Sequence, residues 1–360
     1  MKNTLLIVTM PLAFILFMTA CSKNDNTTPQ QQVSNQDILD NYVNGLVLPN
    51  LKDLNENATK LNSDIEAFIA DKNTDNLTKA RNSWYSTRIS WEQSEAMLFG
   101  PVEDNNFDPR IDSWPVDFNA IQTVWNSQND FTEDYINGLQ DELKGFHPIE
   151  YILFGQNGDA KPEDFTDQRK VDYLAAMSNN LKKITDSLYN DWLPAGGNFA
   201  QNLLKAGTAD SKYSTQQAAF IEIANAMIDI VKEVGDSKLK QPFDEKDPTQ
   251  AESPFSKNSF TDFKNNITGA RNVYLGGYGN SSGASLSNLV AVYNKSLDTR
   301  IQKQLDEIIT NLESYNQDGI TYSEAIVNNR PRVQTSMDML ATLQNTLEDE
   351  LIKLIQLHVK

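Results

Sequence analysis

Residues 51–68 read LKDLNENATKLNSDIEAF, a stretch that indicates the fold class of the chain. Its apolar residues recur at alternating spacings of three and four, the stripe of an amphipathic helix: Leu51, Leu54, Ala58, Leu61, Ile65 and Phe68. A polar break follows at residues 71–76, and a second stripe covers residues 77–98. Arg88 and Glu95 fall on the same face of that second helix as Trp84 and Trp91. We therefore predict two long helices, the second with charges on its apolar face.

The rest of the chain continues the helical pattern. Further helices are predicted at about residues 119–127, 147–154, 171–193, 215–234, 260–274, 284–315 and 331–358, with an acidic loop at 102–118 and a long loop at 236–258. The 16 glycines and 13 prolines are few for 360 residues, which disfavours turn-rich β-folds. We predict an all-α fold of two helical bundles side by side, residues 35–194 and 195–360, divided at the sequence PAGG (194–197).

The first 34 residues are predicted to be an export signal and a tether. Lys2 precedes an apolar run, residues 5–20, that is shorter than a typical membrane span and ends directly before Cys21. This end resembles a bacterial lipoprotein cleavage site, so we predict a signal peptide at 1–20, a lipid on Cys21 and a polar tether at 21–34. An uncleaved anchor helix with an unmodified cysteine is the alternative. The expected location is the bacterial cell envelope, on the periplasmic or outer face of the outer membrane.

The charge and cysteine content exclude several classes of function. The chain has 31 basic and 49 acidic residues, a formal net charge of −18 at pH 7. Such an acidic protein is repelled by phosphate backbones, so we expect no nucleic-acid partner, whereas cations and basic surfaces are favoured. Cys21 is the only cysteine, so a lipid on its thiol excludes disulfides, cysteine nucleophiles and zinc ribbons. The membrane is then expected to be a partner only through the lipid anchor.

His147 and Glu150 form the strongest candidate for chemistry. Gly145 and Pro148 predict a helix that begins near His147, and a spacing of three places the imidazole and the carboxylate on one helical face. The pair can hold a metal or transfer a proton, while a structural histidine cap is the alternative. The metalloprotease patterns HExxH and HxxEH are both absent, the second because Tyr151 replaces the last histidine. A site with one histidine among oxygen ligands suits iron or another hard divalent ion.

The sequence GFHPIEYILFG (145–155) resembles the Gly-x-His-x-x-Glu signature of the imelysin family. Three other blocks are similar to the same family in the same order: WEQSE with FGP (91–101), IDSWP (111–115) and residues 248–276. The resemblance covers about residues 35–355. It implies two helical bundles related by duplication, a site near their interface, and a bacterial envelope protein associated with iron uptake. The family has been classed among metallopeptidases, a label that the absent metalloprotease patterns do not support.

The resemblance also suggests a role for charged residues outside the motif. Arg88 and Glu95 either form a buried ion pair or line the cleft that holds His147 and Glu150. Asp112 either binds the ligand or caps the turn before Trp-Pro. Arg271 lies in an otherwise apolar helical stretch and is expected to reach the site from the second bundle.

Three hypotheses about function follow. In the first, the protein binds iron, or an iron-bearing ligand or partner, with His147 and Glu150 as metal ligands and Glu95 or Asp112 as further oxygen donors. In the second, it is a metal-dependent peptidase with Glu150 as the base. In the third, it is a non-catalytic adaptor that binds another envelope protein or a haem-like ligand, and His147 is structural.

Overall fold

The computed structural model describes residues 33–360, and every regular element in this range is a helix. The α-helices are α1 Asn35–Asn41, α2 Leu48–Ala70, α3 Thr74–Ser94, α4 Pro101–Asp104, α5 Phe107–Asp112, α6 Phe118–Asn126, α7 Glu133–Asn137, α8 Phe146–Phe154, α9 Gln168–Trp192, α10 Ala200–Leu204, α11 Gln216–Glu233, α12 Lys240–Glu245, α13 Ser259–Leu275, α14 Leu286–Tyr293, α15 Lys295–Gln317, α16 Tyr322–Asn328, α17 Arg330–Thr346 and α18 Ile352–His358. Three π-helical segments, η1 Tyr42–Val47, η5 Val234–Leu239 and η7 Leu347–Leu351, and four 3-10 turns, η2 Glu95–Met97, η3 Asp141–Leu143, η4 Pro162–Asp164 and η6 Pro248–Gln250, complete the helical elements. The predicted all-α fold is confirmed.

The stripe at residues 51–68 lies on α2 and is buried along its length. α2 continues directly from the π-helical segment η1, with Pro49 as its second residue, and Asp71 leaves the helix with an extended backbone. Asn73 then caps α3 by accepting a hydrogen bond from the backbone N–H of Asn76. α2 packs against α3 on one side and α9 on another. The two long helices predicted from this region are therefore present and buried as their stripes require.

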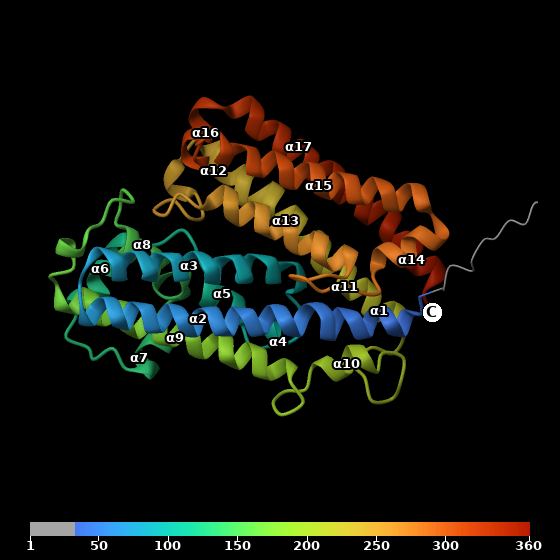
Figure 1. The fold of residues 1–360 in the computed structure, drawn as a ribbon, viewed down its shortest axis with the longest axis horizontal. Helices are drawn as coiled ribbons and strands as arrows, with labels where there is room; N and C mark the ends of the chain where they lie inside the picture. The colour runs from blue at the N-terminus through green and yellow to red at the C-terminus, as the bar shows by residue number, and fades with distance from the viewer. Residues whose placement is uncertain (1–32) are drawn as a thin grey trace, which may run out of the picture. The chain divides into compact units, whose positions relative to one another are not determined.

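The second half of the chain contributes α11, α13, α15 and α17. α13 packs against α15 and α11, and it also packs against α3 from the first half (Figure 1). The close approach of α13 to α3 depends on Gly269, where a Cβ atom would collide with the carbonyl oxygen of Gln93. One continuous apolar core runs through both halves. The boundary after residue 194 falls between α9 and α10; this boundary and the duplication stay predictions.

Some segments predicted as loops contain short helices. The acidic loop at 102–118 holds most of α4 and all of α5. The loop at 236–258 holds most of η5, α12 and η6, and their apolar residues Leu239 and Phe243 are buried. Tertiary burial stabilises these short helices, since isolated helices of such length are marginal in water. The predicted helix 284–315 is broken at Asn294, whose side chain caps α15 by accepting from the N–H of Leu297.

The predicted signal peptide, Cys21 and most of the tether lie outside the described residues. At the tether's end, Ser34 caps α1 in a reciprocal arrangement with Asp37, so the first helix of the described residues begins at Asn35. Within residues 33–360, no helix has the length and apolar character needed to cross a membrane.

Candidate functional site

The charges on the apolar face of α3 are fully enclosed. Arg88, Glu92 and Glu95 are all buried, and they face α13, η5 and the segment between η6 and α13. The Arg88 guanidinium forms ion pairs with Glu92 and Asp112, and lies 3.0 Å from Glu252 Oε1. A buried arginine is tolerated where carboxylates surround it in this way, because desolvation of an unpaired charge is costly.

Asp112 ends α5 and connects the arginine to the histidine. Its Oδ1 pairs with Arg88, and its Oδ2 accepts a hydrogen bond of 2.6 Å from the indole N–H of Trp91. Burial opposes ionisation, but Arg88 and His147 together hold the pKa of Asp112 well below its usual range. Asp112 is therefore a fixed carboxylate in the centre of the cluster.

His147 is placed by a tight turn before α8. Gly145 has φ +82°, a conformation that favours glycine, and a Cβ atom there would collide with the carbonyl oxygen of Ile111. This contact brings the start of α8 against the end of α5. His147 Nε2 then lies 2.9 Å from Asp112 Oδ1, although Nε2 has no hydrogen bond of good geometry. The ring therefore presents Nε2 to the Asp112 carboxylate at ion-pair distance.

The other ring nitrogen faces Glu150, as their spacing predicts. His147 Nδ1 lies 3.2 Å from Glu150 Oε2. Glu150 Oε1 accepts hydrogen bonds from the N–H (2.7 Å) and the hydroxyl (2.6 Å) of Ser256. Burial alone lowers the pKa of His147, but Asp112 on one side and Glu150 on the other outweigh this and raise that pKa to about 9. Both ring nitrogens are thus protonated near neutral pH when no metal is bound.

Lys238 and Glu252 complete the cluster from the second half of the chain. Glu252 Oε1 accepts from Lys238 Nζ at 2.9 Å as well as from Arg88, while Glu252 Oε2 has no hydrogen-bond partner. Lys238 Nζ also lies 3.0 Å from Glu95 Oε2. Burial raises the pKa of Glu95 to about 8, against the opposing charge of Lys238. Glu95 is therefore protonated in a large share of molecules near neutral pH.

Negative groups outnumber positive ones in this cluster. The buried carboxylates are Glu92, Glu95, Asp112, Glu150, Glu252 and Asp262, and the buried cationic groups are Arg88, Lys238 and His147. Burial raises the pKa values of Glu92 and Asp262 well above their usual range, so protons neutralise part of the excess. A bound cation can replace those protons.

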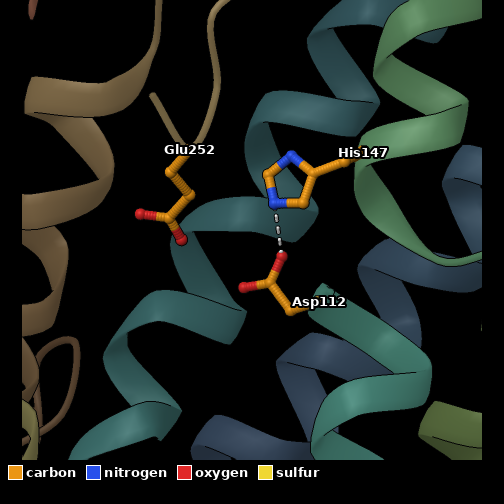
Figure 2. Close-up of side chains that lie close together, drawn as sticks. All are labelled: Asp112, His147 and Glu252. Carbon is orange, nitrogen blue, oxygen red and sulfur yellow. Dashed lines mark ion pairs between the residues drawn. The ribbon is translucent and has the colours of Figure 1, made fainter. Parts of the chain in front are cut away.

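Two sets of side chains in the cluster are close enough to hold an ion. Asp112, His147 and Glu252 each offer an atom within 4.8 Å of the others, and Figure 2 shows these side chains converging from separate segments. Glu92, Glu95 and Asp112 form the second set. Asp112 belongs to both sets. Glu150 belongs to neither, because it lies beside the Nδ1 side of the ring.

A cavity of about 550 Å³ opens next to the cluster. Its polar lining includes three acidic side chains, Asp229, Glu233 and Asp236. Trp114 and Pro115 line this cavity and also a narrow space bordered by His147 and Glu252. Trp114 therefore stands between an acidic opening and the buried cluster.

The structure brings five of the six predicted site residues together but places Arg271 elsewhere. Arg88, Glu95, Asp112, His147 and Glu150 belong to the cluster. Arg271 instead pairs with Asp306 of α15 at 2.6 Å, and 39% of its side chain is exposed. A separation of nine residues turns a helix by about half a revolution, so Arg271 points away from the face of α13 that carries Asp262. The expectation that Arg271 reaches the site is wrong.

Sequence reasoning missed Glu92, Lys238, Glu252 and Asp262. The sequence gives a local indication for Glu92, because it follows Arg88 by one helical turn and residues at this spacing can form an ion pair. Lys238 had none, because it lies in a segment whose local pattern resembles a polar loop. Glu252 lies in the family-like block 248–276, but nothing in its local pattern marks it as a site residue. Their place in the site depends on how this segment packs against α3.

Comparisons with known proteins identify the family of the chain. A sequence model of the imelysin family (peptidase M75) matches residues 47–352. The chain is 30% identical over 339 residues to "Iron-regulated protein A" of Synechococcus elongatus, covering 91% of this chain and 88% of that protein. It is 23% identical over 314 residues to an "Efem/EfeO family lipoprotein" of Staphylococcus haemolyticus, with 85% of each covered.

Two solved structures share the fold. A proposed iron-regulated protein A precursor from Parabacteroides distasonis superposes with a TM-score of 0.80 at 25% identity, covering 89% of this chain and 94% of that one. An imelysin-like protein from Psychrobacter arcticum superposes with a TM-score of 0.71 at 13% identity, covering 90% and 97%. The family match over most of the chain, with the sequence relatives, establishes that this protein belongs to the imelysin family.

Proposed function

We propose that this protein binds an iron ion as its cargo at Asp112, His147 and Glu252, and that it serves iron uptake at the bacterial envelope. The observation that carries the proposal is the unpartnered Glu252 Oε2, buried in a cluster with more carboxylates than cations. The Glu252 carboxylate also offers an atom within 4.8 Å of ligand atoms of Asp112 and His147. A buried carboxylate oxygen without a partner is costly. A cation shared with Asp112 and His147 would satisfy it.

The donor set suits ferrous iron. One imidazole nitrogen with carboxylate oxygens is a mixture that iron accepts, whereas structural zinc favours sulfur and nitrogen ligands. The name of one relative, an iron-regulated protein, supports a role connected with iron. Another relative is called an Efem/EfeO family lipoprotein. The second name also supports the predicted lipid anchor on Cys21. The envelope location and the anchor remain part of this proposal.

Glu150 has an orienting role in the proposed site. It contacts His147 Nδ1 and is held by two hydrogen bonds from Ser256, so it fixes the ring with Nε2 toward Asp112. Carboxylates behind a ligating histidine commonly act in this way. This arrangement favours binding over peptide cleavage, because a base for hydrolysis must reach a water and a substrate, and Glu150 is completely buried with its oxygens already engaged.

The test is an anaerobic Fe²⁺ titration of the purified protein, with elemental analysis of the product. We expect one Fe²⁺ per chain, and a loss of affinity on the order of 100-fold or more in both H147A and E252Q. His358, the second histidine of the chain, is exposed near the C-terminus and provides the matched control H358A, which should bind as the wild type does. Equal affinity in H147A and the wild type would exclude His147 as a ligand.

A further inference from the structure

Lys238 lies where a second cation would be expected. It belongs to the π-helical segment η5, which continues directly from α11, and it is buried. Its Nζ atom is 2.9 Å from Glu252 Oε1, 3.0 Å from Glu95 Oε2 and 3.4 Å from Glu92 Oε2. An ammonium group has three donors, and here three carboxylates receive them. The lysine therefore occupies a pocket of oxygen atoms of the kind that binds a small cation.

Two of these carboxylates also belong to a group of the size that can hold a metal ion. Glu92, Glu95 and Asp112 each offer an oxygen within 4.8 Å of the others. Asn266 stabilises this arrangement, since its side-chain amide donates to Glu92 Oε2 at 2.6 Å and also contacts Glu95. All the candidate ligands are oxygens, which suit hard divalent ions such as Mn²⁺, Mg²⁺ and Fe²⁺. The pocket thus has the chemistry of a cation site, with the lysine ammonium inside it.

We propose that the Lys238 ammonium fills a second cation position formed by Glu92, Glu95 and Glu252, and that it thereby limits the cluster to one metal ion. Glu252 borders both this position and the one at His147, so the two positions are adjacent. Replacing Lys238 by an uncharged residue should open the second position to a hard divalent ion. The proposal extends the proposed function, but the second position can be tested whether or not the first binds iron.

The experiment is a Mn²⁺ titration of wild type and K238M, followed by electron paramagnetic resonance. K238M keeps an unbranched side chain and removes the charge. We expect one Mn²⁺ in the wild type and two in K238M, with magnetic coupling between the two adjacent ions. K238R keeps the charge and should bind one ion. The matched control is K240M, which removes an exposed lysine that pairs with Asp244, and it should also bind one.

The possible outcomes separate the two proposals. If the wild type binds no Mn²⁺ or Fe²⁺ and K238M binds one Mn²⁺, the second position exists and the proposed iron site does not. If folded K238M binds no more Mn²⁺ than the wild type, the inference about Lys238 is wrong and the lysine is an ordinary buried ion-pair partner. Two ions in K238M without magnetic coupling would also contradict it, since the two positions share Glu252.

Loss of Lys238 leaves buried carboxylates without their partner, so the folding of K238M must be measured as well. We expect Mn²⁺ to raise the Tm of K238M more than it raises the Tm of the wild type. If K238M does not fold, the double variant K238M/E92Q removes one surplus charge and keeps Glu95, Glu252 and Asp112 as ligands. It should bind one Mn²⁺ more than E92Q alone, and an equal number in these two variants would overturn the proposal.

Discussion

His147 Nε2 lies 2.9 Å from Asp112 Oδ1, although the two residues belong to different helices, α8 and α5. The contact exists because Gly145 allows the start of α8 to press against the carbonyl of Ile111, the residue before Asp112. Glu252 approaches the pair from the segment after η6. Three segments distant in the sequence therefore meet at the His147 side chain.

The two glutamates near His147 should differ in their effect on metal affinity. Glu252 is a proposed ligand, while Glu150 acts through the ring, so E252Q should lower Fe²⁺ affinity more than E150Q does. We expect E150Q to cost on the order of 10-fold, the range for residues behind a ligand. Isothermal titration under anaerobic conditions measures both, and E56Q on the surface of α2 is the control. A larger loss in E150Q than in E252Q would reverse the two roles.

The stability of the metal-free protein should fall as the pH rises. The pKa of His147 is about 9 in the folded protein and about 6.5 when unfolded, so its stabilising contribution is complete below pH 6.5 and is lost as the pH rises through 9. A difference of this size corresponds to roughly 3 kcal/mol. Chemical unfolding with a chelator present, at pH values from 6 to 9.5, measures it. The stability difference between wild type and H147Q should shrink across this range, and a constant difference would show that the imidazole does not titrate there.

Arg88 and Arg271 should differ sharply in their importance for stability. R88M leaves Glu92, Asp112 and Glu252 without their shared partner, and breaking a buried ion pair costs about 3–5 kcal/mol. R271M removes an ion pair with Asp306 that is exposed on both sides, which is expected to contribute about 0–1 kcal/mol. Urea unfolding of the two variants gives the comparison. Similar losses in both would mean that the cluster is not stabilised by its arginine.

Gly269 should be needed both for packing and for the site. A Cβ atom at this position collides with the carbonyl oxygen of Gln93, so G269A must push α13 away from α3. That movement separates Asn266 from Glu92 and weakens the cluster. We expect a lower Tm and weaker metal binding. G138A is the matched control, because its φ is −80° and the nearest atom to the added Cβ is 3.3 Å away. Unchanged metal affinity in G269A would show that the site tolerates separation of the helices.

The acidic cavity beside Trp114 should affect the rate of metal loading. Negative charge near an opening concentrates cations, and salt screens the effect. E233Q/D236N should therefore slow Fe²⁺ association at low ionic strength, and the difference should shrink at high salt. Stopped-flow mixing measures the rate, with E56Q/E66Q on α2 as a control of equal charge change. If both double variants slow loading equally, the net charge of the protein matters and the cavity does not.

Much of the fold could be predicted because it depends on residues close in the sequence. The apolar stripe from Leu51 to Phe68 requires a buried helical face, and α2 has one. The pairing of His147 with Glu150 follows from their spacing within one helix. The burial of Arg88 and Glu95 was visible from their place on the apolar face of α3. In each case the geometry of a single helix fixes the result.

The site itself depends on contacts between helices. No local pattern indicates that Lys238 and Glu252 lie against α3, because both belong to a segment that reads as a polar loop. For Arg271, the local pattern was misleading. Its place in an apolar stretch suggested a buried role in the site, whereas the packing of α13 directs its side chain toward Asp306. The sequence by itself determined most of the long helices and the charges along them. Only the tertiary structure decided which charged side chains meet. The distances between helices are set by close packing at positions such as Gly145 and Gly269. Helical periodicity describes one helix at a time and carries no information about the distances between helices.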